Sequence, residues 1–186
     1  HGGTNPDGKL STLQESKATG YPSDLTVKSY DFDAILGEFG IPKDSYGYTR
    51  RIHMLIKTFE PEIAASYTVV PEDSCRVPAD LETLRYSVRH NVEKNCGFVF
   101  INNHVRKRSC AEHRDVELTV HCDCGEITLP KLTVRDHDML ILPYNIELGD
   151  AKLLSTNATP LTRLGSRWFF FTDDEPVYNF EGKAAE

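Results

Sequence analysis

Cysteine and histidine residues gather in one stretch of the sequence, and their side chains are the usual ligands of structural zinc. The group comprises Cys110, His113, His121, Cys122 and Cys124. Structural zinc sites usually pair ligands two to four residues apart, whereas one residue separates Cys122 from Cys124 and no second cysteine pair has a matching spacing. We therefore predict no metal site and no cofactor, and we interpret these thiols as buried or strand-edge side chains.

Carboxylates form the second set of residues that could do chemistry. Four of them lie in the loop-rich first part of the chain, where active-site carboxylates are often found: Glu15, Asp31, Asp33 and Glu38. A glycosidase needs two carboxyl groups roughly 5 to 9 Å apart across its substrate, and the sequence does not show that any two of these face each other. The same part also holds aromatic side chains that could stack on a sugar ring or hold loops against a larger body: Tyr21, Tyr30, Phe32 and Phe39.

Composition and missing motifs exclude several classes of function. No phosphate-binding glycine loop and no Gly-x-Ser-x-Gly nucleophile turn is present. With 28 acidic against 21 basic residues the net charge is -7, and the basic residues form no stripe, so we expect no nucleic-acid partner. No apolar run approaches the ~18 to 20 residues that cross a bilayer, so we expect no membrane span.

The cysteine count and the first residues bear on cellular context. Five cysteines are an odd number, which favours reduced thiols and leans weakly toward the cytoplasm, although one pair could still form. The Asn157-Ala158-Thr159 triplet matches a glycosylation acceptor, a short pattern that matters only in a secretory context. The sequence opens on His1 without a leader, so we expect a piece of a longer protein, whose compartment stays unknown.

One helix is predicted over residues 44–59. Tyr48, Ile52, Leu55, Ile56 and Phe59 recur at spacings of three and four residues and form one apolar stripe. The Glu-Pro-Glu triplet at 60–62 should end this helix and mark a domain boundary. The stripe should be exposed unless it docks on the rest of the chain or on a second copy. An exposed stripe could allow the chain to self-associate.

Beyond residue 62 the apolar period changes from 3.6 to 2. Apolar and polar residues alternate over 84–89 and over 116–121, which predicts half-buried strands. Further strands are expected over 98–101, 127–132, 139–142, 152–155 and 168–172, separated by turn-forming residues. Short strands without intervening helices indicate an antiparallel sandwich.

Two segments of the first part resemble signatures of a known enzyme family. Residues 1–5 read His-Gly-Gly-Thr-Asn, and residues 29–40 read Ser-Tyr-Asp-Phe-Asp-Ala-Ile-Leu-Gly-Glu-Phe-Gly. They resemble the Gly-Gly-Thr-Asn and Ser-Tyr-Asp-Tyr-Asp-Ala-Pro-Leu-x-Glu-x-Gly segments of the β-galactosidases of glycoside hydrolase family 35. The later segments 84–90, 97–104, 127–130 and 138–144 are more loosely similar to the β-rich domain that follows the catalytic barrel in larger members.

The resemblance implies the architecture. Residues 1–60 would be the loops and last helix at the C-terminal end of a catalytic (β/α)8 barrel, and residues 61–186 a mainly antiparallel, β-sandwich-like accessory domain. The chain would thus be an α+β fragment of an enzyme, and its partner, a β-galactoside substrate, would bind through the missing part of the barrel.

The resemblance also implies the chemistry. The family hydrolyses terminal β-D-galactosyl residues with retention, using two glutamates on earlier barrel strands, so this chain would hold no catalytic residue and would be inactive alone. Tyr30 matches a tyrosine that lies against the galactose or the nucleophile, and Asn5 would lie at the barrel rim, where it could contact substrate or brace a loop. Phe32 replaces a second tyrosine and lacks its hydroxyl, and Ile35 replaces a proline.

Two other functions stay open. The sandwich could be an independent carbohydrate-binding module that uses exposed aromatic side chains such as Trp168, Phe169 and Tyr178. The chain could instead be a structural β protein stabilised by zinc.

Overall fold

The computed structural model describes residues 34–37, 40–123 and 125–182. The chain divides into two compact units, residues 1–53 and residues 54–186. None of the helices within the described ranges has the length and apolar character required to cross a membrane. The expected barrel-to-accessory boundary at residues 60–61 stays a prediction.

The predicted helix is confirmed as α1, Asp44–Thr58, with an acidic residue in its first turn and Lys57 in its last, as the helix dipole favours. The Glu-Pro-Glu triplet does not lead into a linker, because a second short helix, α2 (Glu60–Ala64), begins directly after Phe59. Pro61 is tolerated there because an N–H in the first turn of a helix has no acceptor within the helix, so its absence removes no hydrogen bond. Residues 60–62 therefore begin a second helix directly after the first one.

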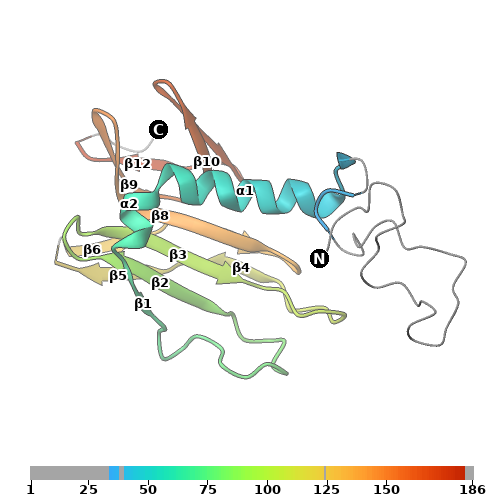
Figure 1. The fold of residues 1–186 in the computed structure, drawn as a ribbon. Coiled ribbons are helices and arrows are strands. Elements are labelled where there is room, and N and C mark those ends of the chain that lie inside the picture. The colour runs from blue at the N-terminus through green and yellow to red at the C-terminus, as the bar shows by residue number, and fades with distance from the viewer. Residues whose placement is uncertain (1–33, 38–39, 124, 183–186) are drawn as a thin grey trace, which may run out of the picture. The chain divides into compact units, whose positions relative to one another are not determined.

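Six antiparallel strands form the main sheet, shown in Figure 1. Their order is β1 (Tyr67–Val69), β2 (Tyr86–Asn91), β3 (Cys96–Asn102), β8 (Met139–Leu148), β9 (Ala151–Thr156) and β12 (Tyr178–Phe180). Three two-stranded sheets accompany it: β4 (His113–Val116) with β7 (Leu132–Val134), β5 (Thr119–Cys122) with β6 (Gly125–Thr128), and β10 (Thr159–Leu164) with β11 (Arg167–Phe171). The prediction of an antiparallel, β-rich region is confirmed, while β1, β10 and β12 had no counterpart among the expected strands.

Two of the expected strands are each divided in the structure. The alternation over residues 116–121 holds, since Val116, Leu118 and Val120 all pack against one cluster, but β4 ends at the first and β5 begins only after the second. The segment 127–132 is likewise divided between β6 and β7, with Pro130 in the gap. Proline cannot donate to a strand ladder, which accounts for the second break.

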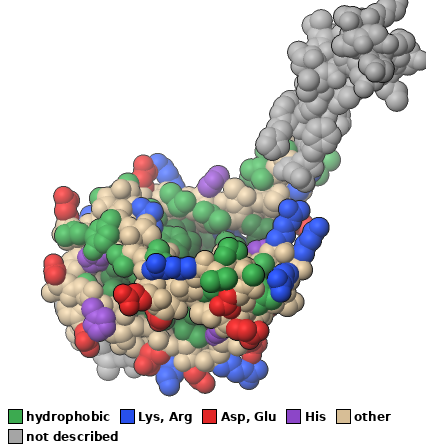
Figure 2. Space-filling model, turned by 90° about the horizontal axis from the view of Figure 1, so that it is seen from below, with side chains coloured by type: hydrophobic (Ala, Val, Ile, Leu, Met, Phe, Trp, Pro, Cys, Tyr) green, Lys and Arg blue, Asp and Glu red, His purple; other side chains and the backbone are tan. Residues whose placement is uncertain are grey.

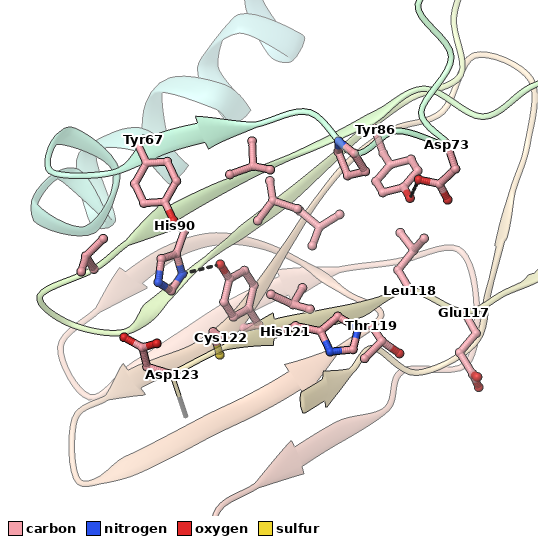
Figure 3. A pocket seen from close by; sticks show the side chains of 17 residues that line it. Tyr67, Asp73, Tyr86, His90, Glu117, Leu118, Thr119, His121, Cys122 and Asp123 are labelled. Carbon is pink, nitrogen blue, oxygen red and sulfur yellow. Dashed lines mark hydrogen bonds between the residues drawn. The ribbon is translucent and has the colours of Figure 1, made fainter. Parts of the chain in front are cut away.

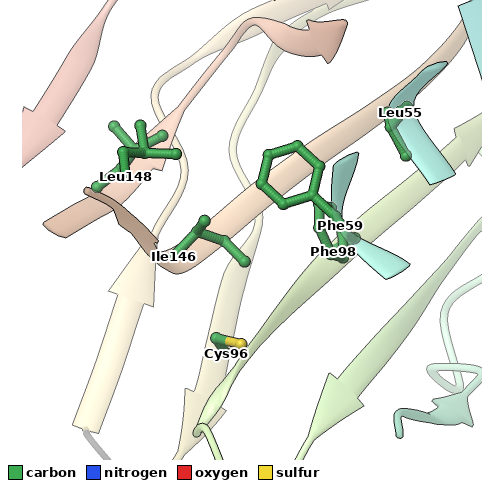
Figure 4. Packing of buried hydrophobic residues seen from close by; sticks show 7 residues of the cluster. Leu55, Phe59, Cys96, Phe98, Ile146 and Leu148 are labelled. Atoms are coloured by element: carbon green, nitrogen blue, oxygen red, sulfur yellow. The ribbon is translucent and has the colours of Figure 1, made fainter. Parts of the chain in front are cut away.

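The main sheet has a hydrophobic cluster on each face. The first cluster joins the end of α1 and the β10–β11 hairpin to the sheet (Figure 4), and its buried members are Leu55, Phe59, Cys96, Phe98, Ile146, Leu148 and Leu153. The second lies under β4–β7 and β5–β6, and its buried members are Val99, Ile101, Leu129, Leu132, Val134, Leu142 and Tyr144. Leu55 and Phe59 are thus docked on the sheet, whereas Ile56 of the same helical stripe is exposed.

Large side chains of strand β8 pack into both hydrophobic clusters, because the alternation of its side chains between the two faces of the sheet reverses at one residue. Tyr144 belongs to the second cluster and Ile146 to the first, although residues two apart in a regular strand share a face. Between them Asn145 adopts a φ of +54°, a left-handed conformation that asparagine tolerates better than most residues. Its side-chain amide donates to the carbonyl of Asn95, 2.7 Å away, which holds this irregularity in place.

Candidate functional site

The residues that the resemblance places at a substrate site lie outside the described part of the chain. This holds for both Tyr30 and Asn5, and also for the early carboxylates and aromatic residues of residues 1–33. Their roles stay predictions.

Cys124 of the cysteine and histidine group lies outside the described residues, and among the described ones no three His, Cys, Asp or Glu side chains come together to hold an ion. Cys110 is buried in a loop and its N–H donates to Asp136, while the Cys122 thiol lies 3.5 Å from the carbonyl of Gly125. The thiols of Cys75, Cys96, Cys110 and Cys122 are free. These residues therefore give the zinc hypothesis no geometric support.

Two other histidines do meet. Nδ1 of His104 lies 2.7 Å from Nδ1 of His137, so that one ring must donate and the other accept. Both residues are exposed, and the ring centroids are 4.9 Å apart. Two nitrogen ligands leave a zinc ion short of the four that a structural site provides, so this pair is better explained as a contact between two loops.

A cavity with polar and aromatic lining lies between the β1–β2 end of the main sheet and the β5–β6 hairpin (Figure 3). Its volume is about 600 Å³, within the range of small-molecule sites. The polar and aromatic side chains that line it are Tyr67, Asp73, Tyr86, His90, Glu117, Thr119, His121, Cys122, Asp123 and Tyr144. The face drawn in Figure 2 carries acidic and basic side chains among hydrophobic ones, without a basic stripe.

One row of cross-strand neighbours forms the floor at one end of this cavity. Tyr67, His90, Gly97 and Tyr144 face one another in register across β1, β2, β3 and β8. The Tyr144 hydroxyl passes over Gly97 and lies 2.8 Å from Nδ1 of His90, and the two rings are nearly parallel. Tyr67 meets the His90 ring edge to face, with centroids 5.8 Å apart. The glycine is what leaves room for this contact between alternate strands.

A tyrosine and a carboxylate form the other end of the cavity. The Tyr86 hydroxyl donates to Asp73, 2.5 Å away. Burial raises the pKa of the Tyr86 phenol well above its usual value, and the hydrogen bond and the charge of Asp73 raise it further. Tyr86 is thus a neutral hydrogen-bond donor throughout the physiological pH range.

This tyrosine yields a prediction about alkaline pH. The pKa of the Tyr86 phenol is higher in the folded chain than its unfolded value of about 10, so the folded chain binds this proton more tightly. The resulting contribution to the free energy of unfolding is therefore complete below about pH 10 and is lost as the pH rises through the pKa of the folded chain. Ultraviolet titration should show Tyr86 among the late-titrating phenols, and Tyr86→Phe should remove one phenol from that group. Tyr178, whose pKa burial also raises, should remain in it. Titration of Tyr86 with the exposed tyrosines would contradict the assignment.

The β5–β6 hairpin supplies the opposite wall. Its strands are held in register by four residue pairs, and Thr119 also contacts Thr128 through their hydroxyls, 3.0 Å apart. His121 and Glu126 lie opposite each other and form an ion pair of 3.1 Å when the histidine is protonated. Leu118 and Val120 face the main sheet and pack against the second cluster, whereas Thr119 and Asp123 of the hairpin, and Glu117 just before it, are exposed residues that also line the cavity.

The aromatic residues named for the carbohydrate-binding alternative do lie together. Trp168, Phe169 and Tyr178 share a cavity of about 500 Å³ with Phe170, Phe180, Leu148 and Ala151. The tryptophan is only half exposed, since its ring stacks on Phe59 at 5.7 Å and the Arg163 guanidinium lies 5.2 Å from its centroid. Among the described residues that line this cavity, the polar side-chain groups are the indole N–H and the Tyr178 hydroxyl.

The glycosylation pattern falls on buried residues. Asn157 is 4 % exposed, its amide donates to the carbonyl of Glu175, and its side-chain oxygen accepts from the N–H of Val177. Thr159 is buried as well, and its hydroxyl accepts from Ile141. In the folded chain Asn157 therefore braces a loop, and its side chain is not accessible as an acceptor.

Comparison of the chain with protein-family models, with curated proteins and with solved structures found no match.

Proposed function

We propose that this chain is part of a retaining β-galactosidase, in which residues 1–60 end the catalytic barrel and residues 61–186 form an accessory domain. The observation that carries the proposal is the order of features along the chain: the two signatures at 1–5 and 29–40, then a helix, then an antiparallel β-rich region. In this proposal helix α1 would be the last helix of the barrel.

The accessory region is consistent with a supporting role in such an enzyme. It has hydrophobic clusters on both faces of its main sheet, which give it a core of its own. The end of α1 packs into the first of these clusters through Leu55 and Phe59. The last turn of α1 is thereby part of the core of the β-rich region.

The proposal assigns no catalytic residue to this chain. Retention requires two carboxyl groups about 5 to 5.5 Å apart, one attacking the anomeric carbon and the other protonating the leaving oxygen and then activating water. In the family both precede the first signature. Tyr30 would orient the nucleophile or contact galactose through its hydroxyl, and Asn5 would contact substrate or brace a rim loop.

The test is hydrolysis by the longer protein. The coding region upstream of His1 should encode barrel strands ending in two glutamates, and the full-length product should release galactose from a chromogenic β-galactoside with retained configuration. The 186-residue chain, assayed in parallel, should release none. A full-length product that folds but does not cleave β-galactosides would refute the proposal.

A non-catalytic carbohydrate-binding module is the second candidate. The clustering of Trp168, Phe169 and Tyr178 in one cavity favours it. Against that location, the described lining of the cavity has two polar side-chain groups to bond sugar hydroxyls, and Phe59 and Arg163 already contact the tryptophan ring. Trp168→Ala should abolish the heat of galactoside binding if this cavity is the site.

A further inference from the structure

We propose that the cavity between β1–β2 and the β5–β6 hairpin binds a neutral oligosaccharide. The inference rests on the side chains that line this cavity and does not depend on the hydrolase activity proposed above. The apolar cavity beside Trp168 is a different surface, formed by β11, β12 and the turn between β8 and β9.

The charge of the lining selects against anions. Asp73, Glu117 and Asp123 contribute three carboxylates, and no lysine or arginine is among the described residues that line the cavity. Phosphates, nucleotides and acidic sugars would bring negative charge toward these groups without a cation to pair with. The ligand is therefore neutral or positively charged.

The hydrogen-bonding groups favour a hydroxylated ligand over an amine. An ammonium group needs only acceptors, whereas each sugar hydroxyl both donates and accepts. The cavity offers both kinds, with carboxylates as acceptors and the hydroxyl of Tyr67 as a group that also donates. Among the described residues Nε2 of His90 has no hydrogen-bond partner, so this nitrogen can bond a ligand.

The aromatic side chains supply the apolar contact that a sugar ring needs. Tyr67 is 51 % exposed and presents its ring at the cavity mouth, on the short edge strand β1. The C–H groups on one face of a pyranose pack on such a ring, while its hydroxyls reach the polar rim. The His90–Tyr144 hydrogen bond over Gly97 fixes the floor before any ligand arrives, which reduces the ordering cost of binding.

The length of the cavity indicates more than one sugar ring. Tyr86 and His90, near its two ends, are four residues apart on β2 (Figure 3), which corresponds to about 13 Å along an extended strand. Val88 and Val99 lie between the ends on the sheet side. Such an elongated floor fits a short oligosaccharide segment.

Calorimetric titration of the 186-residue chain tests the inference. A neutral β-1,4-galactotetraose should give saturable heat, and the acidic tetragalacturonate should not. Tyr67→Ala and Glu117→Gln should each weaken galactotetraose binding about tenfold or more, which corresponds to about 1.4 kcal/mol. Backbone amide shifts of Thr119, Val120 and His90 should follow the titration.

Matched variants separate this site from the rest of the surface. Phe169→Ala removes an aromatic ring of comparable exposure from the apolar cavity, and Glu82→Gln neutralises an exposed carboxylate outside the lining. Both should bind galactotetraose like the wild type, and circular dichroism should show all four variants folded.

Four outcomes would overturn the inference. These are absence of saturable heat with galactotetraose, equal binding of tetragalacturonate, loss of binding in Phe169→Ala but not in Tyr67→Ala, and binding of spermidine alone, which would make this a site for a cationic ligand. Hydrolysis by the longer protein is measured in a separate experiment, so the proposed enzymatic function and the proposed oligosaccharide site can each fail while the other stands.

Discussion

Gly97→Ala should destabilise the β-rich unit by about 3 kcal/mol or more, as overpacking of a filled interior does at its upper end. A Cβ at this position would overlap the carbonyl oxygen of Arg89 on β2 and would lie 2.6 Å from the Tyr144 hydroxyl. Neither atom can withdraw, because the carbonyl is fixed in the β2–β3 pairing and the Tyr144 side chain is fully buried. The cost is steric, since the residue does not need a left-handed backbone.

Urea unfolding of the full chain measures this cost. Gly47→Ala is the matched control, since a Cβ there meets nothing within 4 Å and alanine favours a helix interior by roughly 0.5 to 1 kcal/mol. Glycine-to-alanine substitution should therefore lower the free energy of unfolding at position 97 and leave it unchanged or raise it at position 47. A Gly97→Ala variant within about 1 kcal/mol of wild type would show that the row through His90 and Tyr144 is looser than described.

Gly97→Ala should also abolish galactotetraose binding, because the Tyr144 hydroxyl could no longer reach His90. Titration should be carried out where the variant remains folded by circular dichroism. Unchanged binding by a folded Gly97→Ala variant would separate the ligand site from this floor and would contradict its proposed pre-organisation.

Phe59→Ala should cost about 3 to 5 kcal/mol, the range for removing a fully buried aromatic ring. Phe59 is 2 % exposed and lies at the junction of α1 and α2, where its ring meets Phe98 edge-on at 5.4 Å and stacks on Trp168 at 5.7 Å. Its backbone also joins the two helices, donating to Leu55 and accepting from Ile63. Truncation removes the ring that connects the helices, the sheet and the β10–β11 hairpin.

Fluorescence gives a direct reading of this second variant, because Trp168 is the single tryptophan of the chain. In Phe59→Ala its emission should shift to the red as the stacked ring is replaced by solvent. Ile56→Ala, an exposed apolar position on the same helix, should cost less than about 1 kcal/mol and leave the emission unchanged. A small cost for Phe59→Ala would show that the helices are not anchored through this ring.

Local patterns were enough to predict several elements. Helix α1 follows from apolar residues at helical spacing, and the inward positions of Tyr86, Val88, Val116 and Val120 follow from period-two alternation. Both are properties of consecutive residues, in which backbone geometry alone determines which side chains share a face. The resemblance to β-galactosidases is also a property of short contiguous segments, and the described structure leaves it a proposal.

The cavity could not be predicted in the same way. Its floor depends on the pairing of β3 with β8, which brings Gly97 beside Tyr144 across a long separation in sequence, and on β1, for which no strand was expected. A segment that reads Cys-Gly-Phe does not reveal that the glycine must admit a tyrosine from a remote strand.

The same holds for Asn145, whose left-handed backbone moves β8 from one face to the other and interrupts the alternation on which strand prediction relies. Local periodicity therefore determines which residues point inward. The neighbours that they meet are set by long-range strand register, which arises only when the whole sheet packs.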